Sequence, residues 1–233
     1  MNSRGRTFAL FLLCAVLSPS LVYLVGKFQT ASQELELVVL PPRHAELDRR
    51  GSAEHVILIG DSHIHSLRLE SLEDGTKVRT YGVPGDTSAG VLRRIEQLQT
   101  LGEADAVFIA VGFNDLRNTP QRTVIENIVE STRKIPPGPV ILVGAVLPID
   151  MPARADWQGR DNQLIKAFNA SLARRLQQYP RVIFVDSRSL LVDAQGGLAP
   201  SHHVGDGLHL SEEANRLWAN HLRGRIQEAL ERY

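Results

Sequence analysis

The stretch that decides the fold is VILIGDS, at residues 56–62. Four apolar residues, three of them β-branched, are followed at once by a glycine and two polar residues, which is the pattern of a buried strand that ends in a tight loop. A related order, a strand-forming run and then a polar loop that begins with glycine, returns at residues 78–88 and 106–115. Because the carboxyl ends of parallel strands meet at one edge of a sheet, these loops are expected to lie together.

Working outward, short β-branched runs alternate with stretches of helical spacing. Apolar residues recur on one helical face at Val91, Ile95 and Leu98, and the last helix is predicted to begin after Ser211. Such alternation predicts an α/β fold with a parallel five-stranded sheet and helices on both faces. The expected strands are Val56–Ile59, Val78–Tyr81, Ala106–Val111, Val140–Val146 and Val182–Val185.

Length and charge limit the possible function classes. The chain has 233 residues, 43% of them hydrophobic, which suits one α/β core better than two catalytic domains. Its formal net charge is zero, so the basic surplus that nucleic-acid backbones attract is missing, and no nucleic-acid partner is expected. With a single cysteine, Cys14, the chain cannot form an internal disulfide.

The N-terminus has the pattern of an export segment. Arg4 and Arg6 precede a charge-free run from Thr7 to Gly26, which as a helix is long enough to cross a bilayer core of about 30 Å. We therefore predict a membrane anchor or signal peptide at residues 1–26, a tether at 27–54 and the catalytic domain at 55–233. A cleaved signal peptide stays open because small residues flank Pro19. Either form places the domain in the cell envelope, on the periplasmic or extracellular side, and the anchored form associates with the inner membrane.

Three polar residues fit the requirements of acyl-group chemistry. Ser62 follows the first strand and is expected at a helix N-terminus, where backbone N–H groups face a developing negative charge. His209 can accept the serine proton as a neutral imidazole, and Asp206, three residues earlier, can orient its ring. Ser62, His209 and Asp206 are therefore the candidate catalytic residues.

Donors for an oxyanion are expected from three of the same loops. The candidates are the backbone N–H groups of Ser62 and Gly85 and the side-chain amide of Asn114. A glycine suits the second position because a side chain there would crowd the tetrahedral carbon. Asp115 is expected to make a turn after the third strand.

Four ordered segments carry a resemblance to the SGNH, or GDSL, hydrolase superfamily. The segments are ILIGDS (57–62), GVPGDTS (82–88), VGFND (111–115) and DGLH (206–209). The second resembles the small bacterial periplasmic esterase, thioesterase and lysophospholipase branch. The resemblance implies a flavodoxin-like three-layer α/β/α fold, serine esterase activity on acyl esters or thioesters, and neither a metal nor an organic cofactor.

One position departs from the family pattern. The family name describes a leucine after the nucleophile, whereas His63 stands here. A histidine at that position is similar to SGNH domains that move or remove acetyl groups on polysaccharides. The alternatives are therefore an O-acyltransferase or deacetylase of envelope polysaccharide, or a noncatalytic envelope binding domain, and the substrate is a small-molecule or glycan ester.

The remaining histidines and one long loop complete the candidates. A metal site built from His63, His65, His202 and His203 is not expected. Metal sites need three or four converging ligands with an orienting outer shell, and residues two apart on a helix, such as His63 and His65, do not face the same way. Residues 147–160 form either a substrate wall or an inert surface loop. Three further histidines, His44, His55 and His221, are expected at the surface or at sheet edges.

Overall fold

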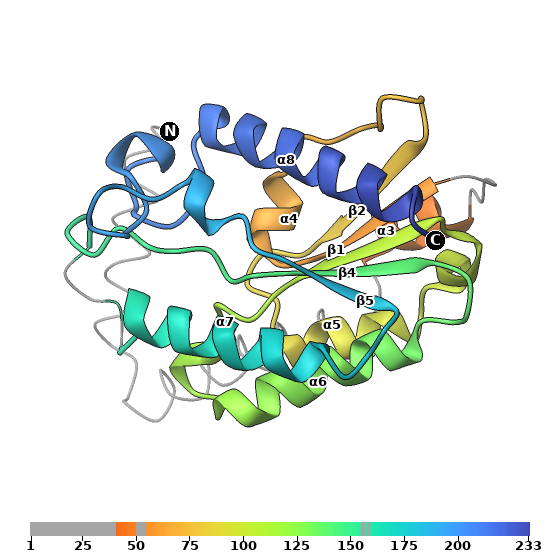
Figure 1. The fold of residues 1–233 in the computed structure, drawn as a ribbon, viewed down its shortest axis with the longest axis horizontal. Coiled ribbons are helices and arrows are strands. Elements are labelled where there is room, and N and C mark those ends of the chain that lie inside the picture. The colour runs from red at the N-terminus through yellow and green to blue at the C-terminus, as the bar shows by residue number, and fades with distance from the viewer. Residues whose placement is uncertain (1–40, 50–54, 155–156, 158) are drawn as a thin grey trace, which may run out of the picture. The chain divides into compact units, whose positions relative to one another are not determined.

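A single parallel sheet organises the computed structural model, which describes residues 41–49, 55–154, 157 and 159–233 (Figure 1). Its five strands follow the order β2-β1-β3-β4-β5, and every neighbouring pair is parallel. The strands are β1 (His55–Gly60), β2 (Lys77–Gly82), β3 (Ala106–Ala110), β4 (Val140–Gly144) and β5 (Val182–Val185).

Helices cover both faces of this sheet. In Figure 1, α4 and α8 lie on one face, and α5, α6 and α7 lie on the other. The helices are α3 (Pro42–Arg49), α4 (Ser62–Ser66), α5 (Ser88–Ile95), α6 (Gln121–Lys134), α7 (Asn162–Leu176) and α8 (Glu212–Leu230). The predicted three-layer α/β/α fold with a flavodoxin-like strand order is therefore confirmed.

Burial on both faces explains why the central strands are continuous apolar runs. All six residues of β1 and all five of β3 and β4 are buried. Leu58 and Phe108 pack with Trp218 of α8 in one core cluster, while their strand neighbours point to the opposite face. The five predicted strands agree with the observed ones to within two residues, because this pattern depends on local sequence.

The strand order also locates the functional edge. The chain leaves β1 toward β2 on one side and later returns to β3 on the other side, so the direction of winding reverses next to β1. In open α/β sheets, ligands bind in the crevice beyond the carboxyl ends of the strands at such a reversal. The loops that follow β1, β2 and β3 meet at this position.

Part of the predicted tether packs on the domain. Residues 42–49 form α3, and the Asp48 carboxylate accepts hydrogen bonds from the Gln99 and Thr100 backbone N–H groups, at 2.8 and 3.0 Å. His44 of α3 is buried against the ring of Tyr81, and His55 is buried at the start of β1. The surface positions predicted for these two histidines are therefore wrong.

The predicted anchor or signal peptide, residues 1–26, lies outside the described residues. Within the described part of the chain, no helix combines the length and the apolar character needed to cross a bilayer.

Candidate active site

Ser62 is the first residue of α4 and lies at the turn that leaves β1. Asp61 caps this helix, since its carboxylate accepts a hydrogen bond from the His63 backbone N–H at 3.0 Å. The Ser62 hydroxyl lies 3.1 Å from Nε2 of His209, although 147 residues separate the two in the chain. The fold therefore brings the predicted nucleophile and the predicted base into hydrogen-bonding contact.

Asp206 holds the ring of His209. One carboxylate oxygen lies 2.6 Å from Nδ1 of His209, and the other accepts the backbone N–H groups of Leu208 and His209, both at 2.9 Å. Partial burial acts to raise the pKa of Asp206, but these hydrogen bonds lower it to about 2. Because an ionised carboxylate can only accept, Nδ1 carries the proton, and the lone pair of Nε2 faces Ser62.

This pair is open to solvent. The side chains of His209 and Asp206 are 41% and 38% exposed. A substrate can therefore reach the hydroxyl and the imidazole without a change in the fold. We call residues 203–209, which carry both side chains, the triad loop.

The two other predicted oxyanion donors lie beside each other. The side-chain amide of Asn114 donates one hydrogen bond to the backbone oxygen of Asp86, the residue after Gly85, at 2.8 Å. Its second hydrogen remains for another acceptor. The Val83 backbone N–H donates to the Gly60 carbonyl at 2.9 Å, so the loop that carries Gly85 is tied to the strand end that precedes Ser62.

The backbone gives a further reason for glycine at position 85. A Cβ at Gly85 would meet no protein atom within 4 Å, whereas the backbone has a φ of +78°, in the left-handed region. The backbone conformation therefore requires the glycine.

A buried network lies beneath these loops. The guanidinium of Arg94 contacts the Asp86 carboxylate at 2.6 Å and donates to the carbonyls of Tyr81 and Gly60, at 2.9 and 3.2 Å. Neither Arg94 nor Asp86 has any exposed side-chain surface. Arg94 thus joins the ends of β1 and β2 to the loop of Gly85. The sequence analysis did not identify Arg94. The pattern that could have identified it is its position on α5 between the apolar residues Val91 and Ile95, on the buried face of the helix.

Asp115 is another buried carboxylate that holds a loop of the site. Its carboxylate accepts the Ser88 backbone N–H at 2.8 Å and the Ser88 hydroxyl at 2.7 Å. Burial raises the pKa of Asp115, although the bonds from Ser88 act to lower it. The predicted role in a local turn is therefore incomplete, because this carboxylate connects the loop after β3 to the start of α5.

His63, the departure from the family pattern, ties the nucleophile turn to the triad loop. Its Nε2 lies 3.1 Å from the Leu208 carbonyl, and its Nδ1 lies 3.5 Å from the Asp61 carboxylate. Burial acts to lower the pKa of His63, but the bond and charge of Asp61 raise it above the ordinary value. A leucine could not form either contact.

The other histidines considered for a metal have separate partners. His65 and His202 face the backbone carbonyls of Gly82 and Leu191, and His203 faces the Asp150 carboxylate. Among the residues that the structure describes, no three histidine, cysteine or acidic side chains are grouped closely enough to hold a metal ion.

The loop after β4 packs against the site. The buried ring of Trp157 lies edge-on to Phe113, with ring centroids 6.4 Å apart, and the guanidinium of Arg160 lies 4.4 Å from the centre of the Phe113 ring. Phe113 directly precedes Asn114. A mainly apolar recess lies next to the nucleophile turn, lined by Asp61, His63, Ala110, Val111, Phe113, Ala145, Val146, Leu147 and Trp218.

Comparisons with known proteins give a family match and several structural neighbours. The model of the GDSL-like lipase/acylhydrolase family matches residues 62–217. No curated protein matches the sequence.

Solved structures share the fold at low sequence identity. A Streptococcus pneumonia protein provisionally named a platelet activating factor is 22% identical, with a TM-score of 0.75 over 90% of this chain and 100% of its own. A GDSL-like lipase from Bacteroides thetaiotaomicron is 19% identical, with a TM-score of 0.67 over 83% and 100%. A lipase/acylhydrolase from Enterococcus faecalis is 20% identical, with a TM-score of 0.60 over 75% and 96%.

Proposed function

The chain belongs to the GDSL-like lipase/acylhydrolase family, and we propose that it is a serine esterase that hydrolyses acyl esters or thioesters through an acyl-serine intermediate. The observation that carries this mechanism is the continuous contact from the Ser62 hydroxyl to His209 and on to Asp206, at 3.1 and 2.6 Å. Those contacts supply a nucleophile, a base and an orienting carboxylate.

The first half of the reaction acylates the serine. The Ser62 oxygen attacks the substrate carbonyl, while its proton passes to Nε2 of His209. The N–H groups of Ser62 and Gly85 and the free amide hydrogen of Asn114 stabilise the oxyanion. As the carbonyl re-forms, the bond to the leaving group breaks, and the leaving alcohol or thiol takes the proton from His209.

The second half frees the enzyme. His209 takes a proton from water, and the resulting hydroxide oxygen attacks the acyl carbon, giving a second tetrahedral intermediate at the same donors. Its collapse releases the carboxylic acid, and the proton returns from His209 to Ser62. Asp206 stays ionised throughout and stabilises the imidazolium.

The decisive experiment removes the nucleophile. Ser62→Ala is expected to abolish labelling by a fluorophosphonate probe and turnover of short aryl esters, with no loss of folding. Ser66→Ala, at the exposed end of the same helix α4, is the matched control and should keep both. Retained labelling or turnover in Ser62→Ala would refute the mechanism. A panel of short esters, long esters, thioesters and acetylated glycans then ranks substrate classes by kcat/KM.

We also propose that the enzyme acts in the cell envelope, on the periplasmic or extracellular side, held by its N-terminal segment. The support is the charge-free run from Thr7 to Gly26 behind Arg4 and Arg6. In cells with a permeabilised outer layer, added protease should degrade the domain while a cytoplasmic marker survives. Equal protection of the two proteins would contradict this location.

A further inference from the structure

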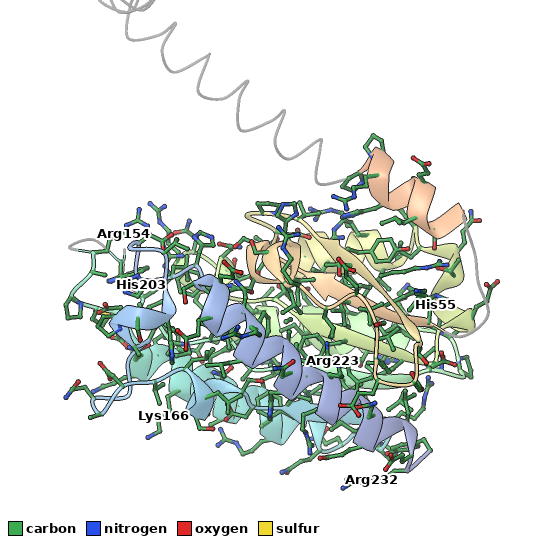
Figure 2. The ribbon with its side chains drawn as sticks, turned by 90° about the horizontal axis from the view of Figure 1, so that it is seen from above. His55, Arg154, Lys166, His203, Arg223 and Arg232 are labelled. Carbon is green, nitrogen blue, oxygen red and sulfur yellow. The ribbon has the colours of Figure 1, made fainter. Side chains whose placement is uncertain are left out.

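A second imidazole–carboxylate pair lies at the other side of the triad loop. Nε2 of His203 lies 3.0 Å from the Asp150 carboxylate, and the two side chains are only 6% and 10% exposed. Asp150 belongs to the loop after β4, which also carries Arg154, and Figure 2 shows His203 and Arg154 at the same end of the domain. The proposed reaction uses neither member of this pair.

The hydrogen bonds define the tautomer of His203. Its Nδ1 accepts the backbone N–H groups of Gly205 and Gly207, both at 3.0 Å, so this nitrogen carries no proton. Nε2 therefore carries the proton and donates it to Asp150. His209 has the opposite arrangement, because its Nδ1 donates to Asp206 and its Nε2 is left to accept from Ser62.

The two N–H groups that donate to His203 lie on either side of the catalytic carboxylate in the chain. Gly205 and Gly207 stand on either side of Asp206, so the ring fixes the backbone both before and after that residue. Gly207 is held a second time, since its carbonyl accepts the Asp150 backbone N–H at 2.9 Å. Asp150, His203 and Gly207 thus form a closed ring of hydrogen bonds.

Gly207, a member of this ring of hydrogen bonds, is closely packed against the loop after β4. Gly207 has a φ of +73°, and a Cβ there would lie 2.8 Å from the Asp150 carbonyl and 2.9 Å from Trp157. The triad loop therefore rests directly on the loop after β4, whose role the sequence left undecided.

We propose that His203 is a positioning residue: by accepting the Gly205 and Gly207 N–H groups, and with its tautomer set by Asp150, it holds Asp206 and His209 in line with Ser62. The proposal rests on the proposed esterase function. It assigns a reaction role to a residue that touches neither substrate nor the reacting atoms.

Two substitutions distinguish the hydrogen bonds accepted by Nδ1 of His203 from the general packing of its side chain. In His203→Asn, the side-chain oxygen occupies nearly the place of Nδ1 and can still accept from Gly205 and Gly207. In His203→Gln, the polar end reaches the place of Nε2, near Asp150, and no acceptor is left at the Nδ1 position. Both variants lose the imidazole ring and its packing, so their melting temperatures should fall by similar amounts.

The expected activities differ. His203→Ala and His203→Gln should lower kcat for a short aryl ester about 100-fold with little change in KM, because a small displacement of a catalytic group has an effect of that size. His203→Asn should recover most of the lost kcat. The control is His202→Ala, since the neighbouring ring faces Leu191, and it should keep wild-type kcat.

The outcomes are decisive in both directions. Recovery in His203→Asn and not in His203→Gln, at matched melting temperatures, establishes the positioning role. Equal kcat in the Asn, Gln and Ala variants, or a wild-type kcat in His203→Ala, would overturn it. Failure of the esterase function itself is recognised separately, because the wild-type chain would then show no turnover, or Ser62→Ala would retain it.

Discussion

The domain contains two pairs of the same side chains, and their surroundings give them different tasks. In the exposed pair, Asp206 accepts from Nδ1 of His209 and leaves Nε2 toward Ser62. In the buried pair, Asp150 faces Nε2 of His203 and leaves Nδ1 toward two backbone N–H groups. The carboxylate selects the tautomer in both cases, but the second nitrogen faces the nucleophile in the exposed pair and the backbone in the buried pair. Residue type alone therefore does not identify a catalytic dyad.

The same division extends to the rest of the site. The Arg94–Asp86 ion pair and the Asp115–Ser88 hydrogen bonds are buried, and both hold loops. The groups assigned to chemistry are instead those that a substrate can reach. We therefore expect the exposed groups to determine the catalytic rate and the buried groups to determine loop geometry and stability.

The largest effect is expected at the exposed carboxylate. Asp206→Asn should lower kcat about 10⁴-fold, because the amide can leave the imidazole in the wrong tautomer. The unfolding free energy should change by less than about 1 kcal/mol, since an exposed ion pair contributes little to stability. Ester hydrolysis and urea unfolding measure the two quantities. A large loss of stability with a modest loss of kcat would mean that the Asp206–His209 pair acts mainly on stability, contrary to the assignment.

Arg94 should show the opposite balance of effects. Arg94→Leu leaves the Asp86 carboxylate buried without its partner, and such a change costs about 3–5 kcal/mol of unfolding free energy. The matched control is Arg175→Leu, whose exposed partner is Glu126, and it should cost about 1 kcal/mol or less. Urea unfolding of both variants measures the difference. Equal losses of unfolding free energy would show that burial of the Arg94–Asp86 pair does not determine its contribution to stability.

The side-chain amide of Asn114 is assigned two tasks, one structural and one catalytic. One amide hydrogen holds the Asp86 backbone, and the other is assigned to the oxyanion. Asn114→Ala should lower kcat about 100- to 1000-fold, the effect of removing one oxyanion donor. Asn127→Ala, which removes an amide that donates to the Ser88 hydroxyl away from the triad, is the control and should lower kcat far less. If the two variants lose kcat equally, the amide of Asn114 acts only on the loop.

The sequence predicted those features that depend on local pattern. Buried parallel strands are continuous apolar runs, so the strands and the loops after them could be located, and Asp206 and His209 are close enough in the chain to be paired. The Asp150–His203 pair could not be predicted, because 53 residues separate its members and no local pattern marks either.

The helix α3 was missed for a related reason. Most of its side chains are polar, and only His44 and Asp48, one turn apart, are buried among those described. An i, i+4 pair of polar residues has no apolar periodicity to detect. The helix is recognisable only from the partners that tertiary structure provides, such as the backbone of Thr100.

The smallest predicted effect concerns His44, a buried imidazole with no carboxylate to hold it. Its Nδ1 is buried and has no hydrogen-bond partner among the described residues. Burial, with the nearby charge of Arg94, lowers the pKa of His44 from 6.5 to about 4. Above pH 6.5 this ring is neutral in both folded and unfolded chains, so its protonation does not affect stability there.

Between pH 6.5 and 4 the unfolded chain takes up a proton that the folded chain refuses, so stability falls as the pH falls. The loss should reach about 2 kcal/mol at pH 5 and about 3 kcal/mol below pH 4. His44→Phe keeps an aromatic ring against Tyr81 and removes the titration, so urea unfolding at pH 7 and pH 5 should show a smaller decline for the variant. An identical decline would mean that the His44 ring is protonated equally in both states. Because the His44 ring packs on Tyr81 and not on a triad residue, the variant should keep wild-type kcat at neutral pH, as expected of a buried group that contributes only stability.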